Sequence, residues 1–196
     1  MKFDQKVQLI IVGESCVGKT SILYKYTKDF FTNQHLATIG LEYFTTEEKI
    51  NDKVIRVKIW DTAGQEQYKS LTKNFYKNSN GVFIVYDVTN KSSFEKVQEW
   101  IQSVIDNGDE NIKMVLIGNK IDLNREVKTE EGQAIANKYK MPFFETSAKE
   151  NINIRDSVMK LVNMVIETQK PREEGLKLED RNNPNNNSEG GSGCKC

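Results

Sequence analysis

The chain has 196 residues, of which 28 are Lys or Arg and 28 are Asp or Glu, so its formal net charge is zero. This balance argues against a protein that binds nucleic acid through bulk positive charge. Its three cysteines cannot supply a disulfide framework, which favours a reducing compartment. We find no secretory signal after Met1, and no apolar run approaches the roughly 20 residues that a membrane-spanning helix needs.

Short apolar runs alternate with helical patterns along most of the chain. The runs predict strands at residues 7–12, 44–50, 54–60, 81–88, 113–118 and 142–146. Helices are expected at residues 19–30, from residue 92 onward, at 129–140 and at 152–170, and residues 31–42 are expected to be irregular. The polar residues 51–53 predict a hairpin between the second and third strands. This alternation predicts an α/β fold with a mostly parallel sheet covered on both faces.

Two helices show their cores in the sequence. Ser92, followed three places later by Glu95, predicts a capping box at the start of one helix. The apolar face of that helix is expected to comprise Phe94, Val97, Ile101, Val104 and Ile105. The stripe of the last helix is expected to comprise Ile154, Val158, Leu161, Val162 and Val165.

The loop after the first strand, Gly13 to Thr20, fits G-x-x-x-x-G-K-[ST] and leads into a helix. Its glycines let backbone N–H groups close on phosphate oxygens, and the helix N-terminus adds its dipole. Lys19 can neutralise the β- and γ-phosphates, and Thr20 can bind Mg²⁺. Glu14 is tolerable there if its side chain points away from the phosphates, and Cys16 is expected to be a small packing residue.

A second polar loop follows the strand that ends at Trp60. Asp61 can hold a metal ion through a water, the N–H group of Gly64 can meet a phosphate, and Gln65 can orient a water. These are the parts needed to sense and remove a terminal phosphate.

The stretch Asn119-Lys120-Ile121-Asp122 follows a buried strand, at the edge where α/β sheets place their ligands. Asp122 can accept hydrogen bonds from the ring N–H and the exocyclic amine of guanine, a pair of donors that adenine lacks. Asn119 can tie the loops together, and the stem of Lys120 can cover the base. Ala148, within Ser147-Ala148-Lys149 after the last strand, can offer its N–H to the guanine carbonyl.

Over about residues 5 to 170 these motifs, in this order, resemble a small GTPase of the Ras superfamily. The resemblance implies a P-loop GTPase fold, with a six-stranded mostly parallel sheet, one antiparallel edge strand, and five helices on both faces. It implies a GTPase domain at residues 1–170 and a disordered tail at 171–196.

The resemblance also assigns roles to residues. Gln65, Lys19 and Thr38 would be catalytic, and Thr20, Thr38 and Asp61 would hold Mg²⁺. The residues expected to bind GTP or GDP are Gly13, Ser15, Cys16, Val17, Gly18, Lys19, Thr20, Ser21, Thr38, Asp61, Gly64, Asn119, Lys120, Asp122, Ser147, Ala148 and Lys149.

Ile39-Gly40-Leu41-Glu42-Tyr43 and Cys194-Lys195-Cys196 are similar to patterns of the Rab family. Both cysteines resemble sites of geranylgeranyl attachment, and two lipids anchor a protein far better than one. A fortuitous or metal-binding cysteine pair is the alternative, but two ligands do not close a tetrahedral zinc site. The resemblance also implies that aromatic residues near the loops of Thr38 and Gln65 contribute to the surface that effectors bind. The candidates are Tyr43, Trp60 and Tyr76.

The resemblance therefore implies a monomeric GTP/GDP switch that regulates vesicle-mediated transport from the cytosolic face of intracellular membranes. Its expected partners are effectors, an exchange factor, a GTPase-activating protein, a prenylation escort and a dissociation inhibitor. Another signalling GTPase of the superfamily is the alternative. From other classes, the P-loop allows a metabolic kinase or ATPase, and a nucleotide-holding module that never cycles.

Overall fold

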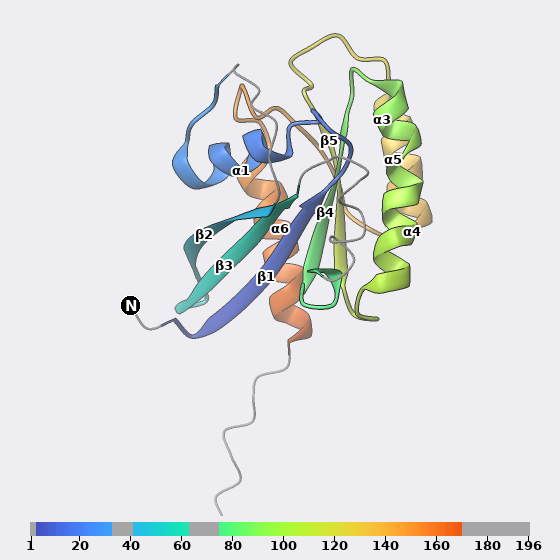
Figure 1. Ribbon diagram of the computed structural model, residues 1–196. Coiled ribbons are helices and arrows are strands. Elements are labelled where there is room, and N and C mark those ends of the chain that lie inside the picture. Colours follow the sequence, from blue (N-terminus) through green and yellow to red (C-terminus); the bar gives the residue numbers. More distant parts are fainter. Residues whose placement is uncertain (1–2, 33–40, 63–74, 170–196) are drawn as a thin grey trace, which may run out of the picture.

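The computed structural model describes residues 3–32, 41–62 and 75–169 of the chain (Figure 1). The strands are β1 (Gln5–Val12), β2 (Leu41–Ile50), β3 (Lys53–Thr62), β4 (Gly81–Asp87), β5 (Lys113–Asn119) and β6 (Phe143–Thr146). The helices are α1 (Lys19–Lys28), α3 (Lys91–Glu95), α4 (Val97–Asn107), α5 (Thr129–Lys138) and α6 (Ile154–Thr168).

The strands form one six-stranded sheet in the order β2-β3-β1-β4-β5-β6. Of the pairs in this sheet, β2–β3 is antiparallel, as the expected hairpin requires, and the others are parallel. Asn51 and Asp52 form the hairpin turn with φ values of 48° and 62°, a conformation that Asn and Asp tolerate best after Gly. The predicted fold class is therefore confirmed.

Two apolar clusters cover the two faces of the sheet, because successive strand residues point to opposite sides. Leu9 and Ile11 of β1 pack toward α1 and α6, whereas Ile10 and Val12 pack toward α3, α4 and α5. The helices divide between the faces in the same way (Figure 1). The expected α6 stripe is buried along its whole length.

The start of α3 corrects one prediction. Asn90, rather than Ser92, is the N-cap, and its side-chain oxygen accepts a hydrogen bond from the Ser93 N–H at 3.2 Å. Asn is as good an N-cap as Ser, and the helix accordingly begins earlier. Only Lys96 separates α3 from α4, so the described residues hold four helices if this pair counts as one, against the five expected.

Two further expectations were wrong in detail. Ile105 is 50% exposed, since it lies about 100° around α4 from buried Val104, and Trp100 lies in the core instead. Leu41 and Glu42, expected to be irregular, belong to β2. The tail at 171–196 lies outside the described residues. Among those described, no helix combines the length and apolar character that crossing a membrane requires.

Candidate nucleotide-binding site

The loop between β1 and α1 is built around two glycines that no other residue can replace without strain. Gly13 and Gly18 have φ values of 143° and 97°. A Cβ atom at Gly13 would lie 2.1 Å from the Val85 carbonyl oxygen, and one at Gly18 would lie 2.3 Å from Asn119 Nδ2. The loop therefore approaches β4 and β5 as closely as backbone allows, and α1 begins directly after it.

Lys19 folds back over this loop. Its side chain is buried, and its Nζ donates to the carbonyl oxygens of Gly13 and Glu14 at 2.9 and 2.8 Å. Burial lowers the pKa of Lys19 to about 8, although the nearby carboxylates of Asp61 and Glu14 oppose the shift. A buried cation that donates to neutral carbonyls is ready to receive an anion, since a phosphate would restore its preference for the charged form.

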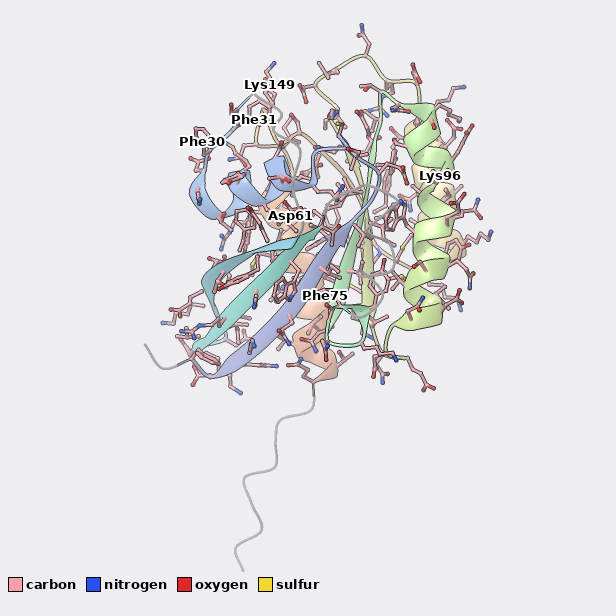
Figure 2. The ribbon with its side chains drawn as sticks, viewed as in Figure 1. Phe30, Phe31, Asp61, Phe75, Lys96 and Lys149 are labelled. Carbon is pink, nitrogen blue, oxygen red and sulfur yellow. The ribbon has the colours of Figure 1, made fainter. Side chains whose placement is uncertain are left out.

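Thr20 and Asp61 meet beside Lys19. Thr20 Oγ1 donates to Asp61 Oδ2 at 2.6 Å, joining the first turn of α1 to the end of β3. Asp61 lies near the carboxyl end of that strand (Figure 2). Asp61 is fully buried, and burial raises its pKa against the opposing effects of Thr20 and Lys19. Its other oxygen, Oδ1, has no hydrogen-bond partner among the described residues. A hydroxyl and a buried carboxylate with one oxygen unpaired among the described residues fit the oxygen ligands that Mg²⁺ prefers.

Asn119, at the end of β5, joins the phosphate-type loop to the loops that follow β5 and β6. Its Nδ2 donates to the Val17 carbonyl oxygen at 2.9 Å, and its Oδ1 accepts from Thr146 Oγ1 at 3.0 Å. Ser147 Oγ donates to Asp122 Oδ1 at 2.6 Å. The expectation that Asn119 ties the loops together is confirmed, and Asp122 lies beside the Ser147 loop.

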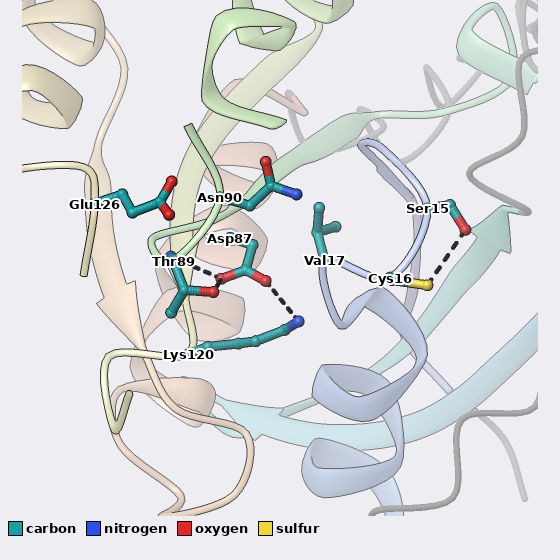
Figure 3. Close-up of a pocket in the computed structure, with 8 residues that line it drawn as sticks. All are labelled: Ser15, Cys16, Val17, Asp87, Thr89, Asn90, Lys120 and Glu126. Carbon is teal, nitrogen blue, oxygen red and sulfur yellow. Dashed lines mark hydrogen bonds and ion pairs between the residues drawn. The ribbon is translucent and has the colours of Figure 1, made fainter. Parts of the chain in front are cut away.

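Lys120 is fixed by a residue that the sequence analysis missed. Lys120 Nζ lies 2.6 Å from Asp87 Oδ2, and Asp87 Oδ1 accepts hydrogen bonds from the N–H and hydroxyl of Thr89 (Figure 3). Lys120 adopts a left-handed φ of 70°, so the chain turns sharply directly after β5. The signal in the sequence was a carboxylate near the end of an otherwise apolar strand.

Next to Lys120 and Asp87 lies an open cavity of about 480 Å³. Its lining residues are Ser15, Cys16, Val17, Asp87, Thr89, Asn90, Lys120 and Glu126 (Figure 3). Cys16 is exposed on its wall with a left-handed φ of 64°, so the expectation that it packs was wrong. Val17 and Lys19 of the same loop are buried, in contrast to Cys16.

The remaining expected site residues divide into two groups. Ser21 lies in the first turn of α1, and Ser147 and Ala148 are buried after β6, where Ser147 pairs through its backbone with Ile152. Lys149 is exposed beside them (Figure 2). Thr38, Gly64 and Gln65 lie outside the described residues.

Aromatic residues from β2, from β3 and from position 75 pack against one another. Trp60 packs against Tyr43 and Phe75 with ring centroids 5.2 and 5.1 Å apart, and Lys58 Nζ lies 3.8 Å from the rings of Tyr43 and Trp60. We call Tyr43, Lys58, Trp60 and Phe75 the aromatic patch. Tyr76 was the wrong candidate, since it is fully buried and its neighbour Phe75 reaches Trp60.

Comparison with known proteins identifies the family. The model of the Ras family matches residues 8–167, which is most of the chain. The chain belongs to the Ras family. It is 36% identical to human Ras-related protein Rab-15 over 183 residues, which cover 92% of this chain and 86% of that protein.

Two further relatives point to the same branch. The chain is 41% identical to Ras-related protein Rab-3 of Caenorhabditis elegans, with 83% of this chain and 75% of that protein covered. It is 33% identical to Ras-related protein Rab-13 of Rattus norvegicus, with 93% and 96% covered. This Ras-family chain is therefore a Rab-like small GTPase, a hydrolase of the class that regulates vesicle-mediated transport. The alternative of another signalling GTPase is not favoured.

Proposed function

We propose that the loops after β1, β3, β5 and β6 form one site that binds GTP and GDP together with Mg²⁺. The observation that carries this proposal is the hydrogen bond from Asn119 Nδ2 to the Val17 carbonyl oxygen. It joins a loop suited to phosphates directly to a loop suited to a base. A metabolic kinase would have no need of a carboxylate such as Asp122 in that second loop.

The phosphates are held by the first loop. Backbone N–H groups between Gly13 and Thr20 face them at the start of α1, with Ser15, Cys16, Val17, Gly18 and Ser21 contributing along the way. Lys19 leaves the Gly13 and Glu14 carbonyls in part and pairs with the β- and γ-phosphates. The pKa of Lys19, which burial lowers to about 8, supports this role, because binding an anion relieves the cost of its burial.

Thr20 and Asp61, together with Thr38, would hold the Mg²⁺ ion. The free oxygen of buried Asp61 supports this assignment. When bound, the ion supplies neutralisation of the charge that develops on the β- and γ-phosphates. Thr20 Oγ1 and Asp61 Oδ2 already touch, so the hydroxyl that would bind the ion lies beside the carboxylate that would hold it through a water.

The base is held by the second group of loops. Asp122 accepts the ring N–H and the exocyclic amine of guanine, with Ser147 orienting its carboxylate. The stem of Lys120, fixed by Asp87, covers one side of the base, and the loop at Ala148 and Lys149 closes the carbonyl edge. Adenine lacks this pair of donors, so the Asp122 carboxylate would be left without its hydrogen bonds, which supports a preference for guanine.

Hydrolysis rests on positioning rather than on covalent chemistry. Gln65 orients the attacking water, Gly64 donates its N–H to the γ-phosphate, and Lys19 and Thr38 stabilise the developing charge. Loss of that phosphate removes a ligand from both Thr38 and Gly64, so the surface that these loops present changes with the nucleotide.

Partners read that change. Effectors dock on the aromatic patch in the GTP state, since aromatic residues often anchor protein interfaces and Tyr43 of the patch is 58% exposed. An exchange factor and a GTPase-activating protein reset the switch, and an escort and a dissociation inhibitor handle the lipidated chain. The protein acts as a monomer on the cytosolic face of intracellular membranes.

Residues 171–196 extend from the GTPase domain of residues 1–170 and carry the anchor. Geranylgeranyl groups on Cys194 and Cys196 supply two lipids. Between Pro171 and Cys196 four basic residues face five acidic ones, so the net charge of −1 offers no polybasic signal and a second lipid is needed. Mass spectrometry of the C-terminal peptide from native cells would reveal both groups, and an unmodified peptide would contradict the anchor.

Competition binding tests the nucleotide assignment. Purified protein is loaded with a fluorescent GDP analogue in Mg²⁺ and titrated with GTP, GDP or ATP. GTP and GDP are expected to displace the analogue, whereas ATP is expected to fail even at a large excess. Displacement by ATP at concentrations similar to GTP would contradict the role of Asp122 and favour a P-loop kinase or ATPase.

A further inference from the structure

Glu14 is the one acidic residue between Gly13 and Thr20, the loop that receives the phosphates. A carboxylate in an anion-binding loop is unfavourable, because like charges a few ångströms apart repel in a partly buried site. Nucleotide binding is therefore favoured if an interaction holds the Glu14 carboxylate away from the phosphates.

The indole of Trp100 is placed to do this. Trp100 Nε1 donates to Glu14 Oε1 at 2.9 Å, across 86 positions of sequence. Trp100 is only 4% exposed and packs within the α4 side of the core, together with Val12 at the end of β1. Its N–H is consequently fixed in direction, and it draws the Glu14 side chain toward α4, on the face of the sheet opposite α1.

The main chain of Glu14, in contrast to its side chain, contacts Lys19. Its carbonyl oxygen accepts a hydrogen bond from Lys19 Nζ at 2.8 Å. Glu14 thus lies close enough to Lys19 for a released carboxylate to turn toward the same ammonium group. There it would compete with the phosphates for Lys19 and repel them at the same time.

We propose that Trp100 is a positioning residue for nucleotide retention, which uses its indole N–H to hold the Glu14 carboxylate outside the phosphate-binding loop. The inference rests on the proposed nucleotide site and adds to it a residue of α4 that touches neither nucleotide nor metal. Loss of the indole N–H frees the charge and speeds the release of GDP.

A double-mutant cycle of Trp100→Phe and Glu14→Gln tests the proposal with the full chain. Glu14→Gln keeps a side-chain oxygen that accepts from the indole but removes the charge. The rate of release of a fluorescent GDP analogue is measured after addition of excess unlabelled GDP, and the melting temperature of each GDP-loaded variant is recorded. Trp100→Leu, which also lacks the donor, is read in the same way and replaces Trp100→Phe if the latter does not fold.

Trp100→Phe is expected to speed release about three- to tenfold when Glu14 is present, and by less than about twofold when it is combined with Glu14→Gln. The acceleration in the presence of Glu14 should shrink at high salt, because salt screens the freed charge. An equal acceleration with and without Glu14→Gln would mean that Trp100 acts only by packing and would overturn the inference, as would an unchanged rate in both cases. Failure of the unaltered protein to bind GDP at all would instead contradict the proposed function.

Discussion

Removal of the Asn119 side chain tests how the two halves of the site are joined. Asn119 is 1% exposed, and its amide makes two buried hydrogen bonds, to the Val17 carbonyl oxygen and from the Thr146 hydroxyl. Asn119→Ala breaks both and leaves two buried polar groups unpaired, at about 1–2 kcal/mol each, or about 2–4 kcal/mol together. Because the nucleotide spans both loops, GDP affinity should fall about 30- to 1,000-fold.

The matched control is Thr146→Val, which preserves the shape of the side chain and removes only one of the two hydrogen bonds. It should cost about 1–2 kcal/mol, or roughly five- to thirtyfold in affinity. Both affinities are measured by calorimetric titration of nucleotide-free protein with GDP in Mg²⁺. If Asn119→Ala changes the affinity by less than about threefold, or no more than Thr146→Val does, the link between the loops is not what organises the site.

Individual contacts give three further predictions. Because the pKa of Lys19 is lowered to about 8 in the free protein and a bound phosphate keeps it charged, GDP binding should take up close to one proton at about pH 9 and almost none at about pH 7. Titration in buffers of different ionisation heat measures this uptake, and its absence at the higher pH would remove Lys19 from the phosphate contact. Gln65→Leu should slow GTP hydrolysis below the unassisted rate of the unaltered protein, which is expected to be on the order of 10⁻⁴–10⁻³ s⁻¹, and should leave GTP affinity unchanged. Single-turnover phosphate release measures this rate, and an unaltered rate excludes Gln65 from positioning the water. Tyr26→Phe removes the 2.7 Å hydrogen bond from the Tyr26 hydroxyl to buried Glu48, a carboxylate that Arg155 also contacts. This change should lower the melting temperature of the GDP-loaded protein by about 3–6 °C. An unchanged melting temperature would show that Arg155 alone satisfies Glu48.

Features that depend on neighbours in sequence could be predicted from the sequence. The glycines around Lys19 and the position of Asn119 at a strand end follow from short motifs between periodic elements, and the structure brings them together as expected. The hairpin at Asn51 and Asp52 follows from turn preferences alone.

Contacts between distant residues could not be predicted in this way. The pairs Glu14–Trp100 and Lys120–Asp87 depend on strand register and on how α4 lies against the sheet, which no local pattern specifies. The choice between Phe75 and Tyr76 depends on a single position, since adjacent helical residues point about 100° apart and only the fold decides which of the two is fully buried. The same limit explains Ile105, at the margin of its helical stripe.

Recognition of guanine by Asp122 can be tested by an exchange of base preference. Xanthine carries a carbonyl where guanine carries its exocyclic amine, so Asp122→Asn offers an amide donor to the altered edge. GDP and xanthosine diphosphate are titrated against the unaltered protein and against Asp122→Asn. We expect the unaltered protein to prefer GDP by about 100-fold or more and Asp122→Asn to reverse the preference. An unchanged preference for GDP in Asp122→Asn would contradict recognition of guanine by Asp122.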